Sequence, residues 1–356
     1  MILKNNKQSL FLVVDAISAE YSKRSSVIKN ISFSLNKGEL ACLLGPSGCG
    51  KTTILNTISG FQNITSGEII LDEKCLSQPN KIIEPEHRSV GMVFQDHSLF
   101  PHLTISENIG FGLKKEPKSK RVEIISAMLA LIGMADQATK YPHELSGGQS
   151  QRVALARAIA PQPKLLLMDE PFSNLDAELR ESLGYEVRVM LKELNITAIM
   201  VTHDQHDAFA LGDQIGVISE GMLLQWDSSF NLYHTPKSRF VANFIGDGVF
   251  IRGKIIEDNV VDTTLGKLRG RCSSTKHLDE EIDLLIRPDH VKYDLKSPIR
   301  GKVIRKAFKG EQTLYTLNTE NGDKLMSLLP SHHDFKIGEM IGMKIEMDDL
   351  VCFKPD

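Results

Sequence analysis

The nine residues that decide the fold of this 356-residue chain are Gly45-Pro46-Ser47-Gly48-Cys49-Gly50-Lys51-Thr52-Thr53. They match G-x-x-x-x-G-K-[ST], a glycine-rich loop whose backbone N–H groups hold nucleotide phosphates while its lysine reaches the terminal ones. The apolar run 40–44 before the loop is typical of a buried strand, and residues 53–58 after it favour a helix. A glycine turn without a ligand is the weaker interpretation, because Lys51 and Thr52 stand where phosphate and Mg²⁺ need them. The stretch therefore predicts an α/β fold with a phosphate-binding loop.

Length and composition predict an ordinary globular chain of roughly two or three domains. Apolar residues make up 41% and charged residues 24%, and 42 basic against 45 acidic residues leave a formal charge of -3. This balance gives no general attraction to nucleic acid. The five cysteines form no CxxC pair, which argues against a disulfide framework or a zinc site and suits a reducing cytosol. No apolar run approaches the ~18 residues that cross a bilayer, so we expect no membrane channel in this chain.

The region after the loop predicts a helical insertion in the nucleotide-binding domain. Gln95 directly follows a strand-like run; such a glutamine is usually a solvated loop residue, but here it could reach a metal or an attacking water. From residue 96 onward the pattern becomes helical, and Ile124, Met128, Leu131 and Ile132 recur at three- and four-residue spacing. We expect a helical subdomain over about residues 96–160.

A second candidate anion site lies at Leu145-Ser146-Gly147-Gly148-Gln149, where a helix running to about residue 160 begins. Ser146 is a natural N-cap, and the glycine pair exposes N–H groups at the positive end of the helix dipole. One nucleotide does not obviously need two such sites in one chain. The second site is therefore expected to serve a nucleotide held by another copy.

Two further strand ends carry polar side chains. The apolar run 165–168 ends in Asp169 and Glu170, and the run 198–201 ends near His203. The carboxyl ends of strands form the edge where α/β sheets bind their ligands. Asp169 can hold Mg²⁺ and Glu170 can polarise an attacking water, although two acids can also simply cap a strand. A lone histidine at a strand end is more often structural, but its place after the acidic pair favours a functional role.

These motifs in this order resemble the ATP-binding subunits of ABC transporters, over Tyr21 to about Phe240. The phosphate loop is shared with many nucleotide hydrolases, and Leu145–Gln149 narrows the resemblance to this family. It implies ATP and Mg²⁺ as cofactors and a head-to-tail homodimer with two sandwiched nucleotides. The nucleotide-contacting residues that it implies are Tyr21, stacking on adenine, Gly45, Pro46, Ser47, Gly48, Cys49, Gly50, Lys51, Thr52, Thr53 and Asp176, with Ser146, Gly147, Gly148 and Gln149 from the opposite subunit.

The same resemblance implies the residues of the reaction. The implied Mg²⁺ ligands are Thr52, Gln95 and Asp169, and the implied catalytic residues are Lys51, Gln95, Glu170 and His203. Glu170 would be the general base and His203 the switch residue that orients the water and the γ-phosphate. The sequence departs from the family at Asn174, where alanine is frequent, and this puts only local dimer contacts in doubt.

The remaining residues predict a different domain. We expect a nucleotide-binding domain over 1–240 and a small β-barrel-like domain, of the OB or TOBE type, over 241–356. Short alternating segments suggest its strands, and Asn321-Gly322 is a strong hairpin signal. Met340, Met343 and Met347 are interpreted, with Ile345, as one packed face of a strand rather than as metal ligands.

A β domain after the ATPase resembles importer subunits that lie peripherally at the cytoplasmic face of the inner membrane. Such subunits work with integral membrane permeases and, indirectly, a periplasmic solute-binding protein. Within that group, residues 99–104 and 244–248 look most like the ferric-ion importer ATPase, so ferric iron is the expected cargo and polyamine (spermidine or putrescine) the alternative. Two other classes fit less well. Soluble ABC ATPases that act on nucleic acid or ribosomes would show two nucleotide domains or a coiled-coil insertion, and exporter ATPases are not expected to carry this β domain. No nucleic-acid partner is expected.

Overall fold

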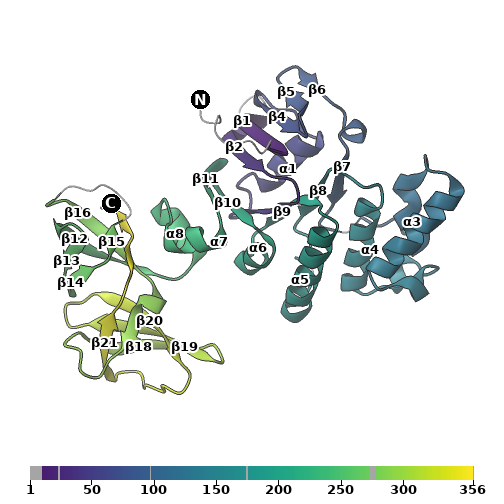
Figure 1. Ribbon diagram of the computed structural model, residues 1–356. Coiled ribbons are helices and arrows are strands. Elements are labelled where there is room, and N and C mark those ends of the chain that lie inside the picture. The colour runs from purple at the N-terminus through teal and green to yellow at the C-terminus, as the bar shows by residue number, and fades with distance from the viewer. Residues whose placement is uncertain (1–9, 23–24, 97, 174, 273–277, 356) are drawn as a thin grey trace. The chain divides into compact units, whose positions relative to one another are not determined.

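The computed structural model describes residues 10–22, 25–96, 98–173, 175–272 and 278–355 (Figure 1). The chain folds into two compact units, Met1–Ser229 and Phe230–Asp356, each with its own hydrophobic core. The expected boundary after residue 240 falls inside helix α8 (Arg239–Ile245), which belongs to the second unit. None of the helices within the described ranges is long and apolar enough to cross a membrane.

A six-stranded sheet organises the first unit. Its strands, in spatial order, are β11 (Met222–Asp227), β10 (Gln214–Ser219), β3 (Leu40–Leu44), β9 (Thr197–Thr202), β8 (Leu165–Asp169) and β7 (Val90–Val93). All neighbours pair in parallel except β10 and β11. Every residue of β3 and β9 is buried, as expected for parallel strands covered on both faces. The predicted apolar strands are therefore confirmed, and their carboxyl ends share one edge.

An antiparallel sheet completes the core around helix α1 (Lys51–Ser59). Its strands, in order, are β2 (Ser25–Leu35), β1 (Leu12–Ser22), β4 (Ser66–Leu71), β5 (Lys74–Gln78) and β6 (Lys81–Ile82), followed in the chain by the 3-10 turn η1 (Pro85–His87). Arg88, 2% exposed, donates from Nη1 to the carbonyls of Thr57 and Ile58, both at 2.9 Å. These bonds satisfy orphan carbonyls at the end of α1 with a cation, which suits the negative end of a helix dipole.

The helical part of this unit is shorter and more broken than expected. Its elements are α2 (Ile105–Gly110), η2 (Phe111–Leu113), α3 (Lys118–Leu131), η3 (Ala135–Gln137), η4 (Pro142–Glu144) and α4 (Gly147–Ile159). The predicted apolar stripe on α3 is partly wrong, because the helix buries Ile125 and Leu129 while Ile124 and Met128 are only partly covered. Buried Asn108 holds the preceding loop through bonds from Nδ2 to the carbonyls of Phe100, Leu103 and Thr104.

Two helices follow the sheet's functional edge. Helix α5 (Ala177–Glu193) connects β8 to β9, and α6 (Gln205–Leu211) connects β9 to β10. Leu183, Val187 and Met190 bury one face of α5, whereas Leu194 lies beyond the helix and is 41% exposed. Both helices begin with an aspartate N-cap, Asp176 and Asp204.

The second unit begins with helices α7 (Ser229–His234) and α8 and continues as a β domain. One five-stranded sheet contains β14 (Gly266–Arg269), β13 (Val260–Thr263), β12 (Val249–Glu257), β16 (Glu281–Ile286) and β23 (Cys352–Phe353). The other contains β17 (Val291–Tyr293), β21 (Met340–Ile345), β18 (Arg300–Phe308), β19 (Gln312–Thr319) and β20 (Lys324–Pro330). A separate two-stranded pair is formed by β15 (Arg271–Cys272) and β22 (Asp349–Leu350). The 3-10 turn η5 consists of Pro288–His290. Both larger sheets contribute to one apolar core.

Two local predictions in this domain have different outcomes. The hairpin is confirmed: β19 and β20 pair antiparallel, and Gly322 has φ 86°, which glycine adopts without Cβ strain. The packed face predicted for Met340, Met343, Ile345 and Met347 is wrong only for Met340. Met343 is buried in the core of this domain, and Ile345 and Met347 pack against that core. Met340 is 41% exposed, because residues three apart on a strand point to opposite faces.

Candidate functional site

The phosphate loop connects β3 to α1 and needs glycine for two different reasons. Gly50, the N-cap of α1, has φ 105°, a left-handed conformation that other residues rarely adopt. A Cβ at Gly45 would lie 2.2 Å from the backbone oxygen of Ile218 in β10. The loop is therefore held between neighbouring backbones, and its N–H groups stand at the start of α1, where the helix dipole favours an anion.

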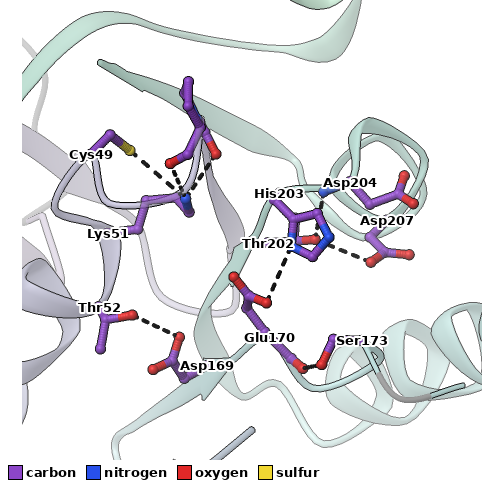
Figure 2. Close-up of polar contacts among 12 residues, drawn as sticks. Cys49, Lys51, Thr52, Asp169, Glu170, Ser173, Thr202, His203, Asp204 and Asp207 are labelled. Atoms are coloured by element: carbon purple, nitrogen blue, oxygen red, sulfur yellow. Dashed lines mark hydrogen bonds and ion pairs between the residues drawn. The ribbon is translucent and has the colours of Figure 1, made fainter. Parts of the chain in front are cut away.

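Lys51 lies at the centre of this loop (Figure 2). Its side chain is 5% exposed, and Nζ donates to the carbonyls of Gly45 and Pro46, each at 2.8 Å. Nζ also lies 3.8 Å from Sγ of Cys49, whose pKa is raised by burial, so that thiol stays neutral beside the ammonium. The loop thus carries one fixed positive charge where phosphate oxygens would arrive.

Thr52 and Asp169 meet at the next position along the sheet edge. Thr52 Oγ1, in the first turn of α1, donates to Oδ1 of Asp169 at 3.2 Å, at the end of β8. Burial raises the pKa of Asp169, and the Thr52 hydrogen bond opposes that shift. A hydroxyl and a carboxylate are oxygen ligands of the kind Mg²⁺ prefers, so these residues fit that ion. Gln95, exposed two residues beyond β7, belongs to the same sheet edge.

Glu170 and His203 form the second pair (Figure 2). Nδ1 of His203 lies 3.2 Å from Oε2 of Glu170, and because a carboxylate only accepts, this contact places the hydrogen on Nδ1. Glu170 has φ 45°, in the left-handed region that disfavours a residue with a Cβ, and its N–H donates to the carbonyl of Val201. Strain of this kind gathers at functional sites, where the surrounding structure holds it in place.

The segment after Glu170 is closed by short hydrogen bonds. Ser173 Oγ donates to the carbonyl of Glu170 at 3.0 Å, and Oδ1 of Asp176 accepts from the N–H of Leu179 at 2.9 Å. Asp176 is therefore an exposed N-cap of α5 in this chain. Asn174, the one departure from the family pattern, lies outside the described residues.

The second anion site has the predicted helix start. Ser146 Oγ accepts from the N–H of Gln149 at 3.3 Å, and Gln149 Oε1 accepts from the N–H of Ser146 at 3.0 Å, which is a complete capping box. Ser146 and Gly147 are exposed and Gly148 is buried. The start of α4 therefore presents an exposed hydroxyl and backbone at the positive end of its dipole.

Tyr21 lies in β1, but its side chain is outside the part that the structure describes. Pro46, Ser47 and Gly48 are exposed on the loop, and Thr53 is buried under it. The side chains that surround His203 were not predicted. Thr202 Oγ1 accepts from the N–H of Asp204 and donates to Asp207, whose pKa is raised by burial and then by Asp204. An aspartate at a helix N-cap position was the available signal for Asp204.

Two family models match the chain: the ABC transporter model over residues 28–173 and the TOBE domain model over residues 284–353. The chain is 38% identical over 330 residues to a spermidine/putrescine import ATP-binding protein, PotA, of Borreliella afzelii, covering 92% of this chain and 93% of that protein. It is 36% identical over 345 residues to the PotA protein of Thermotoga maritima, covering 93% and 92%. The PotA protein of Chromobacterium violaceum is 39% identical over 321 residues, covering 86% and 88%.

Proposed function

The chain belongs to the ATP-binding proteins of ABC importers, and from this premise we propose that it hydrolyses ATP to drive polyamine uptake through a separate membrane permease. The observation that carries the ATPase role is the shared sheet edge. There the Lys51 loop, the Thr52–Asp169 pair and the Glu170–His203 pair follow neighbouring parallel strands. The ordinary alternative, strand-end polar groups without a ligand, does not account for the strained Glu170 or the buried Lys51.

Each residue has a role that its position supports. Lys51 and the N–H groups of its loop bind the β- and γ-phosphates, and Thr52, Gln95 and Asp169 would hold Mg²⁺, directly or through water. An ion held there would supply the positive charge that stabilises the negative charge developing on the phosphate during transfer. Glu170 accepts the proton of the attacking water. With its hydrogen on Nδ1, His203 has an acceptor at Nε2 that can orient a water molecule, and the doubly protonated ring could donate from the same atom to a phosphate oxygen.

The dimer is part of the same proposal. Ser146, Gly147, Gly148 and Gln149 serve the γ-phosphate of the nucleotide bound to a second copy, because the exposed start of α4 is a second anion site that its own loop does not require. Closure on ATP and opening after hydrolysis form a ligand-biased two-state change. Such a change can do work on a permease, with the chain placed peripherally at the inner membrane.

Polyamine is the cargo that the relatives favour. Three of them, each matched across most of the chain, are named for spermidine/putrescine import. The ferric-ion expectation rested on residues 99–104 and 244–248, and nothing in these relatives supports it. A periplasmic binding protein and the permease would select the solute, so the nucleotide site described above does not indicate which solute is transported.

Reconstitution tests the cargo. We expect spermidine or putrescine, with the solute-binding protein, to raise the rate of ATP hydrolysis by the chain in vesicles that contain its co-purifying permease. Ferric iron added in the same way should leave the rate unchanged. Stimulation by ferric iron alone would support the other cargo, and stimulation by RNA or DNA without a permease would contradict import.

The phosphate loop gives a second prediction. Lys51→Met removes a charge-assisted contact to phosphate, usually about 1.5–3 kcal/mol, so the dissociation constant for ATP should rise by about 10-fold or more. Isothermal titration with MgATP measures the change. Lys120→Met is the matched control, because it removes the same charge from an exposed lysine on α3 that pairs with Glu116. Equal affinities for Lys51→Met and the parent chain would contradict the role of Lys51.

A further inference from the structure

Arg180 occupies an unusual position between three parts of the site. It lies in the first part of α5, and Nη1 forms an ion pair with Oδ2 of Asp204 at 2.8 Å. Nη2 donates to the carbonyl of Leu175 at 3.2 Å. Both members of the ion pair are about three-quarters covered, with 24% and 25% of their side-chain surface exposed. The guanidinium therefore joins the segment after Glu170 to the turn after His203.

Asp204 is linked to Glu170 through a single residue, His203. Asp204 directly follows His203, and its carboxylate is held on both oxygens: Oδ1 accepts from the N–H of His206 at 2.8 Å, while Oδ2 accepts from Arg180. His203 in turn contacts Glu170 (Figure 2). Fixing Asp204 thus fixes the turn that aims the imidazole.

The Leu175 end reaches the second anion site. A Cβ at Gly147 would lie 3.4 Å from Cδ2 of Leu175, and one at Gly148 would lie 3.1 Å from Cδ2 of Leu179. The two leucines therefore pack directly against the glycine pair at the start of α4. Leu175 is 7% exposed, so its side of this contact is buried, whereas Gly147 is exposed. Arg180 therefore binds the carbonyl of Leu175, whose side chain packs against Gly147.

We infer that Arg180 is a positioning residue that couples the two ends of the site. It fixes the position of the turn that carries His203 relative to the segment that carries Leu175. His203 acts on the nucleotide of its own chain, and Leu175 packs against Gly147 at the start of α4. That start serves the nucleotide of the second copy in the function proposed above, on which this inference rests. Arg180 does not touch the nucleotide; it acts through Asp204 and Leu175.

A second arginine on α5 provides a matched control. Arg188 also binds one carboxylate and one backbone carbonyl: Nη2 pairs with Oδ1 of Asp213 at 2.7 Å, and Nη1 donates to Leu211. Its ion pair has similar exposure, 30% and 24%. Asp213 accepts from the N–H of Leu40 at the start of β3, opposite the strand's functional end, so this pair supports the fold without contacting His203.

The experiment compares Arg180→Met with Arg188→Met in full-length protein, using phosphate release to obtain kcat and KM for ATP. Because small misplacement of a reacting group costs up to about 10²-fold, Arg180→Met should lower kcat by about 10-fold and change KM by less than about 2-fold. Arg188→Met should keep kcat near that of the parent chain at a similar melting temperature. Arg180→Lys should recover part of the loss, since an ammonium reaches Asp204 but does not reproduce the two-pronged contact.

Asp204→Asn completes the test, because it keeps the cap to His206 and removes the charge that Arg180 binds. If the two residues act together, Arg180→Met and Asp204→Asn combined should lose no more activity than either alone. Parent-like kcat for Arg180→Met, an equal loss in Arg188→Met, or losses that multiply would each overturn the inference. If Arg180→Met does not fold, parent-like kcat in folded Asp204→Asn overturns it and a 10-fold loss there supports it. A parent chain without ATPase activity would instead contradict the proposed function itself.

Discussion

Replacing Glu170 by glutamine lowers kcat for ATP hydrolysis by about 10²-fold or more, the usual contribution of a general base. The amide is nearly isosteric and still accepts the hydrogen bond that His203 Nδ1 donates at 3.2 Å, so the geometry of the pair is retained. What is lost is the capacity to take a proton from the attacking water. Phosphate release at saturating MgATP measures the change, and ATP binding should be unaffected because Lys51 and its loop are untouched.

Glu178→Gln is the control for this substitution. Glu178 is an exposed acid in the first turn of α5, close in the sequence to Glu170 but outside the strand edge, and its exchange should leave kcat unchanged. A Glu170→Gln protein that binds MgATP and still hydrolyses it at nearly the parent rate would remove Glu170 from the role of base. In that case the strained backbone at Glu170 would need another explanation.

The parts of the site that the sequence predicts are those whose cause is local. The phosphate loop combines glycines, a lysine and a hydroxyl at fixed spacing. One of these glycines, Gly50, has φ 105°, a conformation that glycine adopts easily. Buried parallel strands appear in the sequence as apolar runs, and the ends of these runs predict that Asp169 and His203 lie at one edge of the sheet. The structure adds the contacts between them, namely Thr52 with Asp169 and His203 with Glu170. The catalytic roles themselves stay predictions.

The missed features depend on residues far apart in the chain. Arg88 binds carbonyls of α1 from 30 and 31 residues away, and Arg180 reaches Asp204 across 24 residues, so no periodicity or spacing could indicate either contact. The stripe on α3 failed for a related reason. Several adjacent apolar residues allow more than one burial face, and the neighbouring helices decide that Ile125 and Leu129 are covered.

The transported solute is hard to predict from the sequence for a different reason. The site binds and hydrolyses a nucleotide whatever solute the permease carries, so short stretches such as 244–248 are weak guides to the solute. Similarity across both units carries more weight, because it covers 92% of the chain in the Borreliella afzelii relative. That is why polyamine replaces ferric iron as the proposed cargo.

Replacing Ser146 by aspartate, in a chain that also carries Glu170→Gln, abolishes MgATP-driven dimerisation while each chain still binds ATP. Ser146 is the exposed N-cap of α4, and aspartate caps a helix as well as serine does, so the helix should keep its start. The new carboxylate, however, would face the γ-phosphate of the partner's nucleotide. Like charges brought together at an interface cost several kcal/mol, which is enough to prevent closure. Sedimentation velocity with and without MgATP measures the dimer.

Ser146→Asn separates charge from capping, because asparagine also caps well and carries no charge. It should leave part of the dimer in place, and the melting temperatures of the Asp and Asn variants should agree, since both retain the bond to the N–H of Gln149. Titration with a fluorescent ATP analogue should give the same affinity for both variants and the parent, because the Lys51 loop is unchanged. If Ser146→Asp dimerises as readily as its parent, the start of α4 does not face a partner's nucleotide. Each chain would then have to complete its own phosphate site, and the head-to-tail arrangement would be wrong.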